Sequence, residues 1–590
     1  MTTTPSVTGF GWARDSIPTV GTTAERDTRY PTPPAGFKVF NVETGALQRY
    51  SGSAWVTSVS VSVNAADYGC LVSATATANA AGLQAAIDAT PDHGTLVIPP
   101  GAYALSGTPT INDRTGLTVI ADGAVFTLSG AGSCFLKLSG TNNRLRIRGA
   151  SVVGSNTLAD DQWGIGTISP VDFYPGGTDI MVEDCTISDV SRGIVFDVNA
   201  TYDFSDVTIQ HCRVTNILGT TSGHGYGIVV SGTRFAKVLY NYVERAQRHS
   251  IYVSAGDDTL VLGNHIYRHR YGIGTANTVG ALEIARCSRV QAIGNLMVEC
   301  EDGAMDVLPD ESATRAARNI VVMGNTFVDS VHQDLVVGNQ GPDSSGAFEN
   351  ITIVGNVFVR PSSATNNRYA IRVFHGRRVR IANNSFDGDR SYSITIAPIY
   401  LSAAVAATWS NDIVIADNTA YYTATGGGYV AFVEVGSALC TGSSRVVVRD
   451  NHVSLSGGSG GALMLYDVTR TSTSIDVSGN NLADTTGVNA TPAIAGRQTI
   501  SADRGDANVT LDATVDATVQ RFATALTANR TVTLPSSGVY NGLTFRIART
   551  GLGAFTLDVG GLKTIPSATA AFVDVAYDGS AWRLVAYGTL

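Results

Sequence analysis

The sequence predicts an all-β protein whose main part is a right-handed parallel β-helix with coils of about 30 residues. Two observations carry this prediction: a short motif that recurs down the middle of the chain, and the overall composition. The 590 residues include 63 glycines, and 15% of residues are charged while 44% are hydrophobic. Such a composition favours many short strands joined by tight turns over helices.

The recurring motif is an apolar residue, a variable residue, often a glycine, and then an asparagine. It reads VLGN at Asn264 and VMGN at Asn325, and VEDC and IQHC put Cys185 and Cys212 in the same slot. Successive copies lie 23–34 residues apart, which fits a coil of three strands and three turns. Helical repeats would need amphipathic stretches with a 3.6-residue period, which are absent. The predicted ladder is Asn241, Asn264, Asn295, Asn325, Asn356, Asn384, Asn418, Asn451 and Asn480.

We expect this ladder to be structural. Asparagine tolerates the left-handed backbone conformation of a tight turn. Amides stacked about 4.8 Å apart can also hydrogen-bond along the stack. A buried thiol can replace the amide by packing, which accounts for Cys185 and Cys212. The seven cysteines are expected to be buried and reduced, and no metal site is expected.

The start of the repeat region carries a second signal. NAADYGC (64–70), LQAAIDA (83–89) and GTLVIPPGAY (94–103) follow one another, and the middle piece predicts a helix over 79–90. This helix, the one amphipathic helix we expect, would cover the open end of the first coil. The stretch resembles the start of the pectate-lyase-like β-helix superfamily, which includes phage tailspikes and polysaccharide depolymerases. The resemblance spans roughly 64–490 and is specific to the fold, not to the reaction.

The chain divides into three predicted domains: 1–60, a β-helix over 61–498, and 499–590. The first contains FKVFNVETGALQRYSGSAWV, interpreted as two strands around a tight turn, the second ending at Trp55. The resemblance implies a virion-attachment head that binds phage tail or baseplate proteins. The last domain has alternating strands and Gly-rich turns, which predict a β-sandwich. There the resemblance implies an oligomerisation domain that forms a homotrimer.

Charge and hydropathy exclude several classes of partner. A net charge of −9 and a pI near 5.5 argue against nucleic acid. No run of about 18 apolar residues predicts a membrane span, no signal peptide is recognisable, and no cofactor is expected. The resemblance implies a protein of the phage tail, made in the host cytoplasm and acting on a polysaccharide at the host cell surface.

The ladder also serves as a ruler for the outer face. Counting 13 residues back from Asn264 and Asn295 reaches Ile251 and Leu282, each followed by a residue that points outward. Extended to the other coils, this register gives an outward column of Val195, Val229, Tyr252, Glu283, Asp306, Val336 and Arg372.

Carboxylates in this column suggest a catalytic pair. Glu283 and Asp306 fall on adjacent coils, about 4.8 Å apart at the backbone, and Asp334 is expected roughly 8 Å from Asp306 on the diagonal. Retaining glycosidases need carboxylates about 5 Å apart and inverting ones about 6.5–9.5 Å. These three residues are therefore the predicted catalytic residues, although solvated surface carboxylates are the ordinary alternative.

Polar residues in and beside the neighbouring turns are predicted to bind substrate, because turn insertions build clefts on solenoids. They are Arg248, His249, Tyr252, His269, Tyr271 and Arg372. Three functions remain open: hydrolysis of a capsule, exopolysaccharide or O-antigen; lyase chemistry with a His or Tyr base and an Arg; or glycan binding without cleavage. An unsaturated terminal sugar in the products distinguishes a lyase from a hydrolase.

Overall fold

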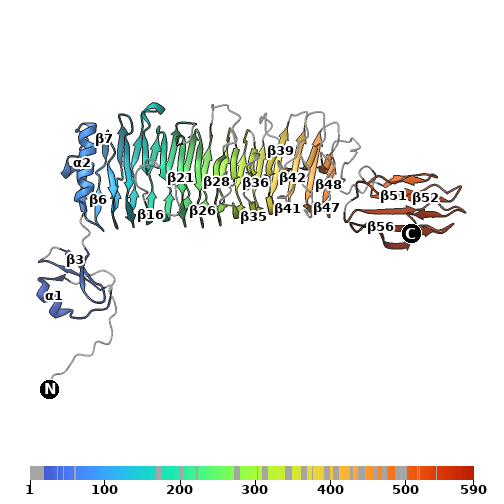
Figure 1. The fold of residues 1–590 in the computed structure, drawn as a ribbon, viewed down its shortest axis with the longest axis horizontal. Coiled ribbons are helices and arrows are strands. Elements are labelled where there is room, and N and C mark those ends of the chain that lie inside the picture. Colours follow the sequence, from blue (N-terminus) through green and yellow to red (C-terminus); the bar gives the residue numbers. More distant parts are fainter. Residues whose placement is uncertain are drawn as a thin grey trace, which may run out of the picture.

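The computed structural model confirms the predicted parallel β-helix, with an N-terminal unit at one end of the stack and a C-terminal unit at the other (Figure 1). Three long sheets of 17, 14 and 13 strands form the solenoid. The structure describes residues 19–35, 37–43, 46–58, 62–167, 176–197, 204–220, 223–270, 280–301, 303–308, 317–331, 333–338, 348–360, 369–374, 376–390, 399–402, 411–424, 430–435, 446–457, 462–467, 475–484, 501–513, 516, 518–539 and 541–590.

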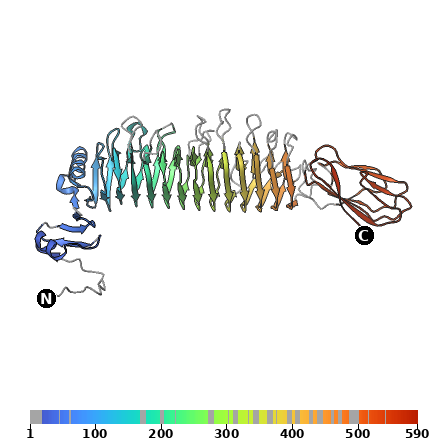
Figure 2. The same ribbon diagram turned by 60° about the horizontal axis from the view of Figure 1, so that its bottom comes forward.

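Each coil contributes one strand to each sheet, and Figure 2 shows the coils stacked along the long axis. One coil consists of β23 (Lys237–Leu239), β24 (Tyr242–Ala246) and β25 (His249–Ser254). Each strand pairs in parallel with the equivalent strand one coil later, as in Ile251 opposite Leu282. Inward residues such as Val238, Val243 and Ile251 are fully buried and belong to one continuous core.

The predicted amide ladder is confirmed. Asn264 Oδ1 accepts hydrogen bonds from the backbone N–H and the Nδ2 of Asn241, each at 3.0 Å, while Asn264 Nδ2 donates to Val238 O at 2.9 Å. The same pattern links each ladder residue to the next as far as Asn480. Cys212 occupies the same slot: its N–H donates to Asn241 Oδ1 at 2.9 Å and its thiol to Gln210 O at 3.3 Å.

The expected backbone conformation of the ladder residues is wrong in one respect. The left-handed residue is the one before each asparagine, as at Gly263, Gly324 and Asp450, whose φ values are 66°, 63° and 55°. Glycine and aspartate tolerate this region better than most residues. The asparagine is thus needed for its amide hydrogen bonds and not for the turn.

The helix at the start of the solenoid is α2 (Ala76–Ala89), which begins three residues earlier than the sequence indicates. The Thr75 side chain accepts a hydrogen bond from Ala78 N and so caps its N-terminus. Leu83, Ala86 and Ile87 are buried against the solenoid core. Figure 1 shows α2 across the N-terminal end of the stack.

The N-terminal unit has more structure than the predicted hairpin. Its sheet has the order β1 (Thr19–Val20), β2 (Lys38–Asn41), β3 (Ala46–Tyr50) and β4 (Trp55–Ser58). Trp55 begins β4, which pairs antiparallel with β3. The sequence predicts Trp55 at the end of the second strand of a hairpin instead. A second helix, α1 (Thr23–Arg29), escaped sequence analysis because seven mostly polar residues carry no amphipathic signal.

The C-terminal unit consists of two sheets that share one core, with Phe545, Ile547 and Val573 on one sheet and Val532 and Val559 on the other. From β49 to β54, successive strands alternate between the sheets and pair in parallel, and the last strands are antiparallel. One sheet contains β49 (Ser501–Asp503), β51 (Val519–Phe522), β53 (Thr544–Arg549), β56 (Ala571–Tyr577) and β57 (Trp582–Thr589). The other contains β50 (Val509–Thr510), β52 (Arg530–Thr533), β54 (Leu557–Val559) and β55 (Lys563–Ile565).

Within the described part of the chain, no helix is long and apolar enough to cross a membrane. The six described cysteines are buried and none of them forms a disulfide.

Candidate active site on the 13-stranded sheet

The outward column expected from the ladder is present on the 13-stranded sheet. We call it the carboxylate row: Val195, Val229, Tyr252, Glu283, Asp306, Val336 and Arg372 occupy consecutive paired positions. Its strands are β18 (Arg192–Phe196), β21 (Tyr226–Ser231), β25, β28 (Gly280–Ala285), β31 (Gly303–Leu308), β34 (Gln333–Val337) and β37 (Tyr369–Phe374). Glu283 lies directly opposite Asp306.

A second row runs beside it, three residues earlier on each strand. We call it the aromatic row: Trp163, Arg192, Tyr226, His249, Gly280, Gly303, Gln333 and Tyr369. Trp163 lies on β15 (Trp163–Gly166). The spacing of three shows that each strand bends between the rows, with two consecutive residues turned inward. Sequence analysis missed this row because it assumed strict period-2 alternation, although a count of three back from the carboxylate row finds it.

The first of the two inward residues is usually small. These residues form a third column, which we call the small-residue column. Its members are Gly164, Gly193, Gly227, Ser250, Ala281, Ala304, Asp334 and Ala370. A methyl group on Gly193 would lie 2.2 Å from Gly227 O, and one on Gly227 would lie 2.5 Å from Ser250 O. The bend therefore brings successive backbones too close for larger side chains at these positions.

Glu283 is held by a histidine of the aromatic row. His249 Nδ1 lies 3.0 Å from the carbonyl oxygen of Gly280 and 3.3 Å from Glu283 Oε2. Both oxygens are acceptors, so Nδ1 carries the proton in this arrangement. Burial lowers the pKa of His249 to about 3, which keeps the imidazole neutral at physiological pH. Glu283 itself is 8% exposed.

Asp306 leans into a gap that two glycines leave in the aromatic row. A methyl group on Gly280 would lie 2.9 Å from Asp306 Cγ, and one on Gly303 would lie 3.1 Å from its Oδ1. Neither glycine has a positive φ, so close approach and not backbone strain explains them. Asp306 is 1% exposed.

Aromatic rings lie beside Glu283. Tyr226, His249 and Tyr252 form one cluster, in which the tyrosine rings lie 5.3 and 4.9 Å from the imidazole and 5.6 Å from each other, and the Arg248 guanidinium lies 5.4 Å from the Tyr226 ring. Burial raises the pKa of Tyr252, and the Glu283 carboxylate raises it further. The aromatic faces and the tyrosine hydroxyl groups both suit a sugar ring, which stacks on the former and accepts hydrogen bonds from the latter.

The aromatic row extends the site toward the N-terminus. The Arg192 guanidinium lies 3.5 Å from the centre of the Trp163 ring, and Asp161 Oδ1 lies 3.2 Å from His224 Nε2 and 3.7 Å from Arg192 Nη1. Ser191 Oγ donates to the same Asp161 oxygen at 2.7 Å. None of these residues was predicted as a site residue.

The prediction for Asp334 is wrong. Its position two residues before Val336 falls in the small-residue column, so the side chain points inward and is 0% exposed. Asp334 forms a buried ion pair with Arg360, whose Nε donates to Asp334 Oδ2 at 2.8 Å. Burial raises the pKa of Asp334 more than the guanidinium lowers it. The 8 Å pairing with Asp306 across the outer face therefore does not exist.

The predicted substrate-binding residues divide into four groups. His249 and Tyr252 lie beside Glu283 and Arg248 lies near Tyr226, as described above, whereas Arg372 lies two coils beyond Asp306, 5.7 Å from the Tyr369 ring. The prediction that His269 lies at the surface is wrong. Its side chain is 0% exposed, and its Nδ1 lies 3.4 Å from Ser250 Oγ in the interior. Tyr271 lies outside the described residues.

Among the residues that the structure describes, no group of three or more His, Cys, Asp or Glu side chains is arranged to hold a metal ion.

Comparisons with known proteins agree with this architecture. Residues 174–360 match the family described as "Right handed beta helix region", and the search of curated proteins finds no match. Among solved structures, the A-module of Azotobacter vinelandii mannuronan C-5 epimerase AlgE6 is similar at 16% identity and a TM-score of 0.46, covering 71% of this chain and 99% of that chain.

A mutant tailspike protein of E. coli bacteriophage HK620, in complex with pentasaccharide, is similar at 14% identity and a TM-score of 0.39, covering 70% and 78% of the two chains. The family 28 exopolygalacturonase of Yersinia enterocolitica is similar at 13% identity and a TM-score of 0.35, covering 74% and 82%. These likenesses are too distant to carry an argument about chemistry.

Proposed function

We propose that the protein binds a polysaccharide along the 13-stranded sheet and hydrolyses it with Glu283 and Asp306. The observation that carries this proposal is the direct pairing of the two carboxylates on adjacent strands, beside the rings of Tyr226, His249 and Tyr252. The backbone spacing of about 4.8 Å between paired strands is nearest the separation of about 5 Å found in retaining glycosidases. Asp334 is turned inward and 0% exposed, so the wider pair expected between Asp306 and Asp334 is not available for inversion.

The contact with His249 assigns the two roles. We assign Glu283, whose Oε2 lies 3.3 Å from His249 Nδ1, as the nucleophile. Asp306 protonates the glycosidic oxygen while Glu283 attacks the anomeric carbon, so the leaving sugar departs and a glycosyl ester forms. Asp306 then takes a proton from water, which attacks the anomeric carbon and releases Glu283.

The test uses purified protein and polysaccharide from candidate host bacteria, with release of reducing ends as the readout. Glu283→Gln and Asp306→Asn should each lower the rate by roughly a hundredfold or more, with thermal stability nearly unchanged. Glu299→Gln is the matched control, because Glu299 is a 36% exposed carboxylate paired with Arg268 in a turn outside the paired rows. Unchanged turnover in both site variants would remove these residues from the mechanism.

One observation favours a second candidate, a polysaccharide lyase. His249 is kept neutral by burial and Arg248 lies beside it in the sequence and near Tyr226, which together provide a base and a cation to balance a uronate carboxylate. A lyase would give products with a 4,5-unsaturated terminal sugar, detected by ultraviolet absorption. Saturated products support hydrolysis, and binding without products would indicate a recognition fibre.

We further propose that the protein acts in a phage tail, with the N-terminal unit attached to tail or baseplate proteins and three copies in the assembly. The proposal rests on the resemblance of the sequence around 64–103 to tailspike β-helices and on the separate units at the two ends of the solenoid. The polysaccharide would then be a capsule, exopolysaccharide or O-antigen at the host surface.

A further inference from the structure

A hollow lies on the 14-stranded sheet, away from the sheet that carries Glu283 and Asp306. It is formed by β39 (Ser385–Arg390), β42 (Thr419–Ala424), β45 (His452–Gly457) and the start of β48 (Asn481–Asp484). Its volume is about 440 Å³, within the range of about 300–1,000 Å³ that is usual for small-molecule sites.

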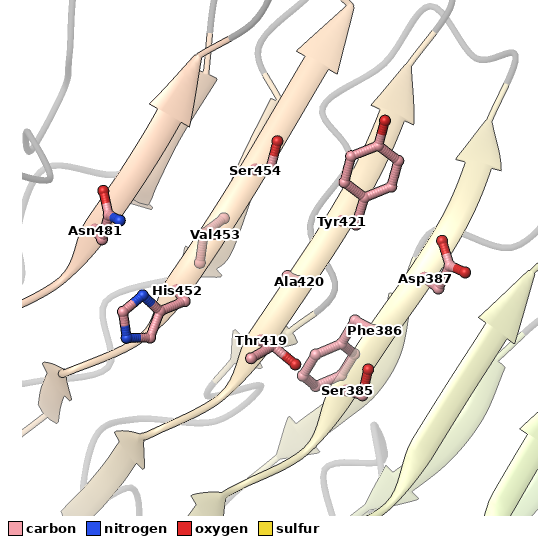
Figure 3. A pocket seen from close by; sticks show the side chains of 10 residues that line it. All are labelled: Ser385, Phe386, Asp387, Thr419, Ala420, Tyr421, His452, Val453, Ser454 and Asn481. Carbon is pink, nitrogen blue, oxygen red and sulfur yellow. The ribbon is translucent and has the colours of Figure 1, made fainter.

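Two outward rows border this hollow. Ser385, Thr419 and His452 are paired across three coils, and Asp387, Tyr421 and Ser454 are paired two residues further along the same strands. Figure 3 shows Tyr421 standing between the strands that carry Asp387 and Ser454. The hollow is open because the side chains of Ser385, Thr419 and Ser454 are short, and the Tyr421 ring projects beside it.

The tyrosine at the hollow is well exposed and makes no polar contact within the described residues. Tyr421 is 60% exposed, whereas Tyr422, the next residue, is 1% exposed and points into the core. Within the described residues, neither the Tyr421 hydroxyl nor the Asp387 carboxylate takes part in a hydrogen bond or ion pair. An exposed ring and an unengaged carboxylate, side by side at a hollow, are groups that a ligand can use.

The lining defines the chemistry of that ligand. It contains the exposed ring of Tyr421, the imidazole of His452, three hydroxyl-bearing short side chains and one carboxylate, and no lysine or arginine is among the described lining residues. Asp387 repels anions, which excludes phosphate groups and acidic sugars. A carboxylate accepts hydrogen bonds from vicinal hydroxyls, and an aromatic ring packs against the C–H face of a sugar.

We propose that this hollow is a second saccharide-binding site, which holds a neutral sugar by stacking on Tyr421 and by hydrogen bonds from sugar hydroxyls to Asp387. The site has no paired carboxylates and serves for attachment only. Because it lies on a different sheet from the proposed active site, it holds the protein on a glycan surface while the other sheet processes a chain, which raises the effective concentration there.

The test places a reporter at the hollow of the full-length protein. The chain is labelled with 3-fluorotyrosine, the Tyr421 signal is assigned by its loss in Tyr421→Phe, and short gluco-, manno- and galacto-oligosaccharides are titrated. We expect at least one neutral series to shift this signal and oligogalacturonate to leave it in place. Because the active-site rows lie on another sheet, Glu283→Gln should respond in the same way, so failure of the proposed hydrolysis leaves this outcome intact.

Variants give the second readout, by calorimetry with the oligosaccharide that binds. Tyr421→Ala and Asp387→Asn should each weaken binding about tenfold. Tyr240→Ala is the matched control, because Tyr240 is 53% exposed on a turn elsewhere, and it should bind normally. A Tyr421 signal that no neutral oligosaccharide moves overturns the proposal. A Tyr421→Ala protein with a smaller assembly mass would also overturn it, because the face would then be a contact between copies.

Discussion

At the scale of single residues, close packing decides which carboxylates can act. Asp306 reaches its position because Gly280 and Gly303 have no side chains, while Asp334, one coil later, is turned inward by the bend of the strand and neutralised by Arg360. Three acidic residues that look equivalent in the sequence therefore have different environments. Part of the difference arises from distant neighbours, since Gly280 lies 26 residues from Asp306 and Arg360 lies 26 residues from Asp334 along the chain.

Gly280 provides a test of this packing. Gly280→Ala should displace Asp306, since the added methyl would lie 2.8 Å from its backbone nitrogen and 2.9 Å from Cγ, and should lower the rate of polysaccharide cleavage by at least about tenfold. Gly303→Ala, with its nearest approach of 3.1 Å to Asp306 Oδ1, is the graded comparison and should lose less. Steady-state rates and melting temperatures of both variants provide the measurement, and equal rates in Gly280→Ala and the wild type would contradict this role.

His249 should make the free energy of unfolding depend on pH. Its pKa in the folded protein is about 3, below the ordinary 6.5. The unfolded chain therefore takes up a proton between about pH 6.5 and 3 that the folded chain does not. The free energy of unfolding should fall with decreasing pH in that window, by up to about 1.4 kcal/mol per pH unit from this group.

Urea unfolding at pH 7, 5 and 4 measures this slope. His249→Gln should reduce it, while His211→Gln should leave it unchanged, because the His211 side chain is 54% exposed. Equal slopes in the wild type and His249→Gln would show that His249 does not stay neutral in the fold.

At the scale of the elements, the asparagine ladder fixes the register on which the site depends. Each ladder amide bonds to the coils before and after it, so that strands of all three sheets are aligned from one turn. An error of one residue in this alignment would turn Glu283 inward and an apolar neighbour outward. The ladder thus contributes to function through position alone.

Asn325→Ala tests the ladder in the middle of the stack. The change removes four side-chain hydrogen bonds: two that Asn325 Oδ1 accepts from Asn295 N and Nδ2, and two that Asn325 Nδ2 donates to Ala292 O and Asn356 Oδ1. Their loss should cost about 3–5 kcal/mol. Asn350→Ala is the control, since Asn350 bonds to Asn319 at the exposed surface. Chemical unfolding measures both, and a loss of under about 1 kcal/mol in Asn325→Ala would contradict the structural role.

At the scale of the whole molecule, the proposed functional sites occupy different positions along the axis of the solenoid and on different sheets around it. The two ends carry distinct β units (Figure 1), the 13-stranded sheet carries the proposed active site, and the 14-stranded sheet carries the Tyr421 hollow. Parallel stacking permits this because each outward row is a straight line of side chains about 4.8 Å apart.

The proposed assembly is tested by its mass. Three copies of a 61.6 kDa chain should give about 185 kDa by light scattering. Removal of 499–590 should yield smaller species if that unit holds the copies together. A full-length mass of one chain at micromolar concentration would exclude the trimer.

The sequence alone determined the coil, the ladder and the alignment of Glu283 with Asp306, because these follow from a local repeat whose motif recurs in successive coils from Cys185 to Asn480. It also located α2 to within three residues, from its apolar spacing. The conformation before each asparagine, the inward turn of Asp334 and the burial of His269 needed the tertiary structure. Each depends on how closely one coil lies on the next, and that distance is set by contacts between residues far apart in the chain.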